Sequence, residues 1–234
     1  MKKGFLVMMM TAAAFCCGQT TGTAKTVGND FNYVVEQFAD LQILRYQVKD
    51  FETLTVKQKE LVYYLSQAAL GGRDILFDQN GKYNLIIRKM LEAVYTDYKG
   101  DRSGKDFRAM EVYLKRVWFS NGIHHHYGAD KFIAGFTPDF FRKALKSVDP
   151  KKLPLVKGQT VDQLCKAIFP VIFDPSVTPK RVNQAAGVDL IKTSACNYYE
   201  GVTQQEAEDF YNAMKNPTDA EPVMYGMNSR LVKE

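Results

Sequence analysis

The chain has 234 residues, of which 46% are hydrophobic and 24% charged, and its formal net charge at pH 7 is +5. This length and apolar content suffice for one domain with a sizeable core. The nearly balanced charge leaves no basic footprint of the kind that DNA or RNA binding requires, so no nucleic-acid partner is expected.

The first 17 residues predict an export signal. Lys2 and Lys3 form a basic start, and the uncharged run over 4–14 is too short to span a bilayer. A cysteine after that run, Cys17, resembles a bacterial lipoprotein signal, although the residues before it match a lipobox poorly. We therefore expect an exported protein, periplasmic or anchored to the membrane by a lipid on Cys17. A linker over 18–29 then precedes the folded part, and its flexible composition counts against the alternative of a buried N-terminal helix.

From residue 30 onward, apolar periodicity predicts a mostly helical chain, whose helices before Pro217 can bury their own apolar faces. The spacing over 30–48 suits an amphipathic helix, and a capping box of Thr55 and Gln58 opens a second helix that ends at Gly71-Gly72. A turn is expected at Asp78–Gly81. Further helices are expected at 83–98, 107–120, 137–148, from Thr160 to about Phe169, and from Thr203 to the Asn216-Pro217 stop, with Phe210 and Met214 of the last one facing inward.

The last residues change pattern. Pro222–Glu234 nearly alternates apolar and polar residues, which predicts a strand, a turn and the start of a second strand. A two-stranded ribbon alone is marginal in water, so we expect the chain to be truncated inside a β element, with the backbone groups of Ser229–Glu234 left without strand partners. The fold class predicted for 30–234 is therefore mainly α with a short C-terminal β element. Cys165 and Cys196 could bridge in an exported protein, but such residues are more often buried small hydrophobes.

The stretch 117–138 holds the only Trp and all three His of the chain. Asn121-Gly122 can end the preceding helix because both residues tolerate the left-handed conformation, and Thr137-Pro138 can begin the next. An ordered polar loop between two helices is a common way to support functional groups.

A resemblance to a known family is carried by two segments. The first is Leu54–Arg73, L-T-V-K-Q-K-E-L-V-Y-Y-L-S-Q-A-A-L-G-G-R; the second runs from Asn121-Gly122 through Gly128 and Lys131-Phe132 to T-P-D-F-F. Together they resemble the N-terminal part of dipeptidyl peptidase III, a zinc exopeptidase family, in its Bacteroides-like bacterial form. The likeness spans most of 31–234.

The resemblance implies a two-lobed α+β metallopeptidase. In that family one lobe carries the zinc motif H-E-x-x-G-H and a downstream glutamate ligand, and the other contains a β-barrel with helices packed on it and binds the substrate peptide as an added strand. This chain has no His-Glu pair. The resemblance thus implies the N-terminal part of the substrate-binding lobe, inactive alone, with an oligopeptide substrate, zinc in the full-length parent and none bound here, and the remaining C-terminal part as partner.

Within that resemblance, the His-rich loop offers the candidate contacts. Tyr127 and Phe132 would give a hydroxyl and an apolar contact to a peptide side chain, and Asn121 could bond either polarity of its backbone. Phe132 as a core residue and Asn121 as a helix cap only are equally open. His124 and His126 could share a metal ion from an extended segment, where alternate side chains lie on one face. Packing and hydrogen bonding within the loop is the favoured interpretation of these histidines.

Two other function classes remain open. A non-catalytic exported helical peptide-binding module would explain the signal, the absence of catalytic pairs and the many Tyr and Phe residues. A free-standing metal-dependent hydrolase built on the three histidines is the weaker hypothesis, because Asp130 is the one carboxylate near them.

Overall fold

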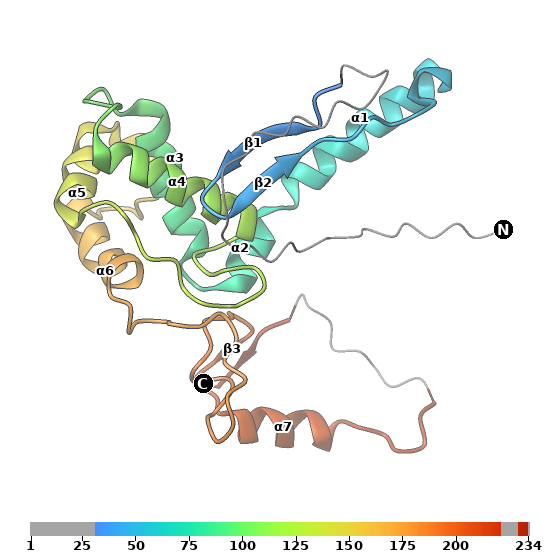
Figure 1. Cartoon of the computed structure of the whole chain (residues 1–234). Coiled ribbons are helices and arrows are strands. Elements are labelled where there is room, and N and C mark those ends of the chain that lie inside the picture. The colour runs from blue at the N-terminus through green and yellow to red at the C-terminus, as the bar shows by residue number, and fades with distance from the viewer. Residues whose placement is uncertain (1–30, 221–228, 234) are drawn as a thin grey trace, which may run out of the picture.

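The computed structural model describes residues 31–220 and 229–233. The described chain is mainly helical with a few short strands, as predicted. Figure 1 shows a cluster of helices from which a hairpin and one long helix project to one side, with a smaller C-terminal part on another. In chain order the elements are β1 (Val34–Phe38), β2 (Leu41–Leu44), α1 (Val56–Gly71), α2 (Asp74–Asn80), α3 (Asn84–Asp97), α4 (Lys105–Ser120), α5 (Pro138–Ser147), α6 (Val161–Phe173), β3 (Tyr199–Glu200), α7 (Gln204–Ala213) and β4 (Leu231–Val232), with short 3-10 turns at Phe51–Thr53 and Pro150–Lys152.

Helices α3, α4, α5 and α6 form the hydrophobic core, which we call the helical core. Helix α3 packs on α4 and α5, and α5 packs on α6. Each helix buries one stripe of residues spaced three or four apart, as a helix that faces a core must. The fully buried members include Ile87, Met90, Leu91, Val94, Met110, Leu114, Val117, Phe141, Leu145, Ile168 and Ile172. The helices predicted at 83–98, 107–120 and 137–148 are thereby confirmed.

Helix α6 runs further than the sequence predicts. Its Thr160–Gln163 capping box is present, but the helix continues through Pro170 to Phe173 instead of ending near Phe169. An internal proline costs roughly 3 kcal/mol because it removes one backbone hydrogen bond. Val171 and Ile172 are buried beyond it, and each such side chain contributes about 1.5–3 kcal/mol, so burial outweighs the proline. Cys165 is buried in this helix, and neither its thiol nor that of Cys196 forms a disulfide.

The prediction of a helix over 30–48 is wrong. Strands β1 and β2 instead pair as an antiparallel hairpin around Ala39-Asp40, with Ala39 in the left-handed region at φ 48°. A bulge between Val34 and Glu36 shifts the register by one residue. The bulge interrupts the alternation of apolar and polar residues that marks a strand, so the apolar residues of this segment are spaced as in a helix.

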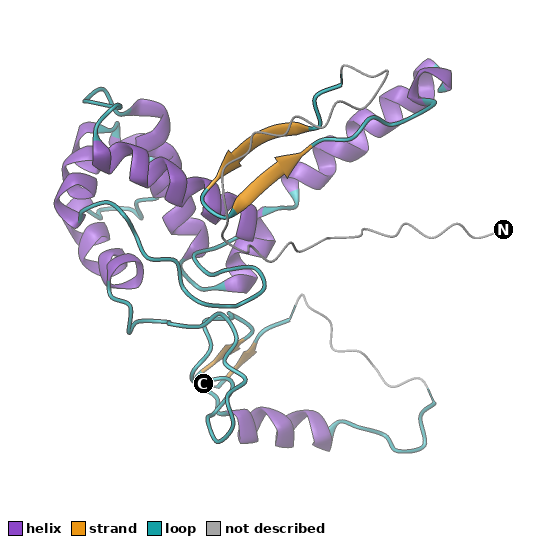
Figure 2. Ribbon diagram, in the orientation of Figure 1, coloured by secondary structure: helices purple, strands orange, loops and turns teal. Residues whose placement is uncertain are grey.

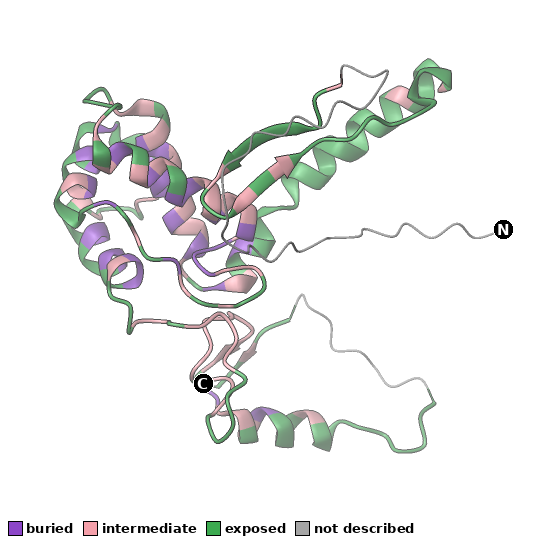
Figure 3. Cartoon of the chain, viewed as in Figure 1, coloured by how far each residue is buried: buried purple, intermediate pink, exposed green. Residues whose placement is uncertain are grey.

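Helix α1 begins as predicted but does not pack as predicted. The Thr55–Gln58 capping box is formed, yet no residue of the helix is buried. Leu61, Tyr64 and Leu65 are each more than half exposed, and Figure 3 shows α1 exposed along its length while the buried residues gather in the helical core. The expectation that the helices bury their own apolar faces is wrong here. We call β1, β2 and α1 together the arm (Figure 2).

The turn predicted at Asp78–Gly81 is also placed wrongly, since residues 78–80 are the last turn of α2 and only Gly81 lies outside the helix. Helix α7 has its predicted Thr203–Glu206 capping box and ends at Ala213, a few residues before the expected stop. Phe210 and Met214 were expected to face inward, but both are exposed, because α7 lies apart from the helical core (Figure 1).

The C-terminal strand has a partner within the chain. The start of a strand after 229 is confirmed, but β4 pairs in parallel with β3, where Leu231 N–H donates to Tyr198 O and Lys233 N–H to Glu200 O, both at 2.9 Å. The expectation that this strand lacks backbone partners is therefore wrong. The first strand of the predicted ribbon, from Pro222 to about Met227, lies outside the described residues.

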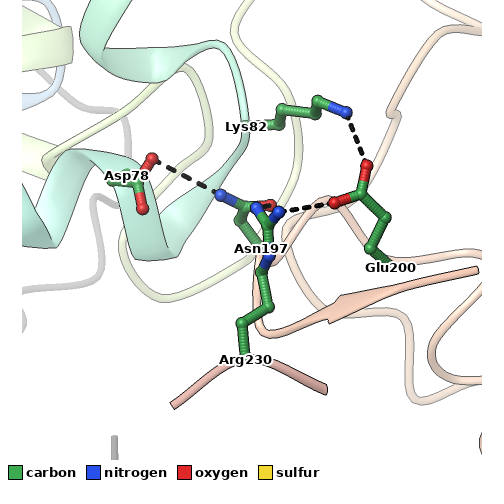
Figure 4. Close-up of polar contacts among 5 residues, drawn as sticks. All are labelled: Asp78, Lys82, Asn197, Glu200 and Arg230. Carbon is green, nitrogen blue, oxygen red and sulfur yellow. Dashed lines mark hydrogen bonds and ion pairs between the residues drawn. The ribbon is translucent and has the colours of Figure 1, made fainter. Parts of the chain in front are cut away.

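A polar network attaches this part to the helices (Figure 4). Glu200 accepts from Lys82 at 3.0 Å and from Arg230 at 2.5 Å, while Asn197 bonds Asp78 of α2 at 3.4 Å and Arg230 at 3.2 Å. The network thus joins the end of α2 to segments that follow it by more than a hundred residues.

Candidate functional site

The His-rich loop is an ordered element. Helix α4 ends at Ser120 and is capped by Asn121, whose φ of 51° and ψ of 43° place it in the left-handed region, as the sequence predicts. The chain then turns back on itself, and His125 N–H donates to Asp130 O at 2.7 Å and Phe132 N–H to Ile123 O at 2.8 Å. A third segment lies beside these two paired stretches of the loop, since Arg181 N–H donates to Ala129 O at 2.8 Å.

Asn121 connects the end of α4 to this loop. Its backbone carbonyl accepts from Asn80 Nδ2 at 3.1 Å. Arg181 in turn donates to Asn80 Oδ1 at 3.4 Å and to His126 O at 3.0 Å. The side-chain oxygen of Asn121 is buried and has no hydrogen-bond partner within 31–220 and 229–233. Asn121 is therefore the C-cap of α4, and its buried Oδ1 accepts no hydrogen bond from the described residues.

The two predicted aromatic contacts meet at His125. The ring centroid of His125 lies 6.5 Å from that of Tyr127 and 6.3 Å from that of Phe132. Phe132 is 5% exposed and packs under the Arg116 guanidinium at 4.9 Å, whereas Tyr127 is 57% exposed. Phe132 thus belongs to the core and to the wall of the site, and Tyr127 is the one that presents surface.

An open cavity of about 420 Å³ lies beside these residues. Its walls come from the end of α4 and the returning part of the loop, and include Arg116, His125, Lys131, Phe132 and the 82% exposed Ile133. Lys131 Nζ donates to the carbonyls of Asp174 and Val177, and burial lowers its pKa. The cavity combines apolar surface with the cationic side chains of Arg116 and Lys131 and with the carboxylate of Asp130, so its wall carries groups of both charges.

No sequence pattern pointed to Asp40, which the hairpin turn brings next to two residues of the cavity wall, Arg116 and His125. Asp40 forms an ion pair with Arg116 and lies 3.7 Å from His125 Nε2. The hydrogen bond from Arg116 is the main cause that lowers the Asp40 pKa. His125 Nδ1 accepts from the backbone N–H groups of Tyr127 and Gly128, so Nε2 carries the hydrogen that faces Asp40. A predicted hairpin turn at Ala39-Asp40, in place of a helix, would have indicated that Asp40 is free to contact a distant segment.

The two candidate metal ligands, His124 and His126, have different surroundings. His124 is 2% exposed, and its Nε2 lies 2.7 Å from Thr178 O. The ring of His126 packs against Phe119 at 5.0 Å and Tyr127 at 4.5 Å between centroids. Burial lowers the pKa of both histidines, that of His124 to about 4. In the described part of the chain, no three His, Cys, Asp or Glu side chains gather in a group suited to a metal ion.

No protein-family model matches the chain, and no curated protein matches it. None of the helices in the described ranges combines the length and the apolar character that crossing a membrane would require.

Proposed function

We propose that this chain is the substrate-binding portion of a zinc-dependent dipeptidyl peptidase, similar to dipeptidyl peptidase III, that removes dipeptides from the free N-terminus of peptides. In this proposal it forms the N-terminal part of the lobe that contains the β-barrel. The observation that carries it is the exposure of α1, together with the resemblance of Leu54–Arg73, which covers that same helix.

Helix α1 is apolar on more than one side. Leu61 and Leu65, one turn apart, share one face, and Tyr63 and Leu70 lie elsewhere around the helix; all four are 57% exposed or more. A helix that is apolar all round is usually enclosed by other protein. A stand-alone peptide-binding module would be expected to cover such a helix itself, so the exposure favours a portion of a larger protein over that alternative.

The His-rich loop supplies the peptide contacts in this proposal. Phe132 forms an apolar wall of the 420 Å³ cavity, and Tyr127 offers an exposed ring and hydroxyl next to His125, which also lines that cavity. Asn121 lies outside the cavity wall, and its side-chain oxygen is buried. Arg116 and Lys131 place positive charge at this wall, where Arg116 already pairs with Asp40 and Lys131 Nζ already donates to the carbonyls of Asp174 and Val177.

The residues of this chain do not fit the zinc site of the family. His124 Nε2 is committed to Thr178 O, and His125 Nδ1 accepts two backbone N–H groups. We therefore assign the zinc ligands and the general base to the remaining C-terminal part of the parent protein. Export, with a lipid anchor on Cys17, belongs to the same proposal; residues 1–17 lie outside the described part.

An activity assay tests the proposal. The purified chain should not hydrolyse dipeptidyl-arylamide substrates, with or without added zinc. The coding sequence that continues from Glu234 should contain H-E-x-x-G-H in frame, and its product joined to this chain should show chelator-sensitive turnover. A continuation without that motif would refute the proposal, and so would chelator-sensitive turnover by the chain alone.

A further inference from the structure

The excess positive charge of the chain is concentrated in one short segment, which we call the basic end. Residues 142–166 run from the second half of α5 through the following loop to the first turns of α6. Their acidic residues are Asp149 and Asp162, and their basic residues are Arg142, Lys143, Lys146, Lys151, Lys152, Lys157 and Lys166. The net charge of the segment is thus the same +5 as that of the whole chain, so the remaining residues are balanced.

The fold gathers cations from both helices around one carboxylate. Helices α5 and α6 pack together, and Asp162 in the first turn of α6 forms ion pairs with Lys146 at 2.8 Å and Arg142 at 3.6 Å. Lys166 follows Asp162 by one turn of α6, so the two lie on the same face of that helix. Lys143 precedes Lys146 by three residues of α5, which makes them neighbours on its surface. The cations of the two helices therefore share one surface, and a single carboxylate lies among them.

The loop between these helices ends in a tight turn with a cation at its tip. Gln159 N–H donates to Val156 O at 2.9 Å, and Gln159 Oε1 accepts from Val156 N–H at 3.2 Å. Lys157 and Gly158 are the two central residues of the turn, and Gly158 has a φ of 81°, which favours glycine at this position. Lys157 is exposed, and Val156 beside it is 69% exposed. The turn presents an apolar side chain next to a cation.

Much of this positive charge is not neutralised within the protein. Arg142 and Lys146 share Asp162, and Lys152 pairs with Asp97 of α3 at 2.7 Å. The other four basic residues of the basic end are exposed and form no ion pair with any residue in 31–220 or 229–233: Lys143, Lys151, Lys157 and Lys166. An exposed cluster of one sign attracts partners of the opposite charge.

The composition of the basic end favours a phospholipid surface over a nucleic acid. The segment 142–166 contains no aromatic residue on which a base could stack. All of its cations except Arg142 are lysines, which act as point charges and do not form the two-pronged contacts of Arg. Clusters of four to eight basic residues are typical of proteins that bind anionic phospholipids. The exposed Val156 adds an apolar group that can enter the headgroup region.

We propose that the basic end binds the surface of a bilayer that contains anionic phospholipids, with its lysines beside the headgroup phosphates and Val156 at the headgroup boundary. Figure 1 shows α5 and α6 on the side of the helical core away from the arm, so the arm would remain accessible. No residue of the basic end lines the 420 Å³ cavity. The inference does not rest on the proposed peptidase function, and a lipid on Cys17 would add to the same attachment.

Sedimentation of the full chain with vesicles tests the proposal. Vesicles of equal parts phosphatidylglycerol and phosphatidylcholine present anionic headgroups, and vesicles of phosphatidylcholine alone carry no net charge. Each cation close to an anionic surface contributes about fivefold in affinity, so the four unpaired lysines should favour the mixed vesicles by more than about a hundredfold. This preference should fade at high salt, where the charges are screened.

Two variants with the same net charge show whether the basic end is the surface that binds. The first carries Lys143→Gln, Lys151→Gln, Lys157→Gln and Lys166→Gln, and should bind the mixed vesicles more than about a hundredfold more weakly. The control removes four exposed lysines elsewhere in the chain and should bind nearly as the parent does: Lys49→Gln, Lys57→Gln, Lys192→Gln and Lys215→Gln. Residues 1–17 are the same in both variants, so they do not account for a difference. The single variant Lys157→Gln, at the tip of the turn, should lose about fivefold.

Three results would each overturn the proposal. Equal losses in the two fourfold variants would mean that net charge, and not this surface, governs binding. Equal affinity of the parent for the two kinds of vesicle would mean that anionic headgroups are not recognised. Binding of the parent to duplex DNA or to polyglutamate, without binding to the mixed vesicles, would assign the basic end to another class of partner.

Discussion

The helical core and the arm follow the same local rules but differ in what their apolar side chains contact. Both contain a capping box built from Thr and Gln, at Thr55 for α1 and at Thr160 for α6. In α6 six residues are buried, and in α1 none is. Helix start signals therefore report where a helix begins, whereas burial depends on which other segments are present to cover it.

The difference predicts an unequal response to loss of the same side chain. Leu114 in α4 is fully buried and Leu65 in α1 is 60% exposed. Leu114→Ala should lower the free energy of unfolding by about 2–5 kcal/mol, because it removes buried methyl groups and leaves a cavity. Leu65→Ala should change it by less than about 0.5 kcal/mol. Chemical denaturation of both variants measures the two values.

The distinction between core and arm would be wrong if the two substitutions lowered the free energy of unfolding of the isolated chain by similar amounts. The same two variants in the larger protein that we propose would test the comparison further. There a partner should cover α1, so Leu65→Ala should also lower the free energy of unfolding.

The second prediction concerns stability in acid, which should depend on His124 in the loop that packs on the helical core. The pKa of His124 is about 4 in the folded chain because of burial and about 6.5 when unfolded. The unfolded state therefore binds the proton first, so the stabilisation is complete above pH 6.5 and is lost as pH falls from 6.5 to 4. The loss should reach roughly 3 kcal/mol.

Denaturant titrations at several pH values between 4 and 7 measure this slope. In His124→Gln no proton can bind at this position, so the slope in that window should flatten. An unchanged slope in the variant would show that another group governs the acid response.

The sequence predicted the helical core well, because each of its helices carries a periodic apolar stripe that this chain itself covers. It predicted the cap at Asn121 because the left-handed conformation has a local residue preference. It failed for 30–48, where exposed strands and a bulge removed the alternation that distinguishes a strand from a helix. The contact of Asp40 with Arg116 joins residues 76 apart, and no local pattern encodes it.

The third prediction uses the matched capping boxes. Thr160→Ala should lower the global free energy of unfolding by about 1 kcal/mol, because α6 is part of the cooperative core. Thr55→Ala removes the same hydrogen bonds from α1, but it should leave the global value almost unchanged and speed amide hydrogen exchange over 56–71. Hydrogen exchange and denaturant titration of both variants check this. A global loss of similar size in both would place α1 in the same cooperative unit as α6.

The smallest effect is expected where the arm touches the core. The Asp40–Arg116 ion pair joins the hairpin turn to α4, and the Asp40 side chain is 52% exposed. Exposed pairs contribute about 0–1 kcal/mol, so Asp40→Asn should cost less than about 1 kcal/mol of global stability. Because Arg116 lowers the Asp40 pKa, this contribution is present above the ordinary pKa of 3.8 and declines as pH falls below it. Hydrogen exchange over 34–44 should rise in Asp40→Asn at low salt, and the difference from the parent should fade at high salt, where the charges are screened. Glu36→Gln, which breaks the 2.5 Å pair with Lys115, is the matched variant and should behave alike. A salt-independent loss as large as that of Leu114→Ala would mean that the hairpin is an integral part of the core, and the distinction between arm and core would fail.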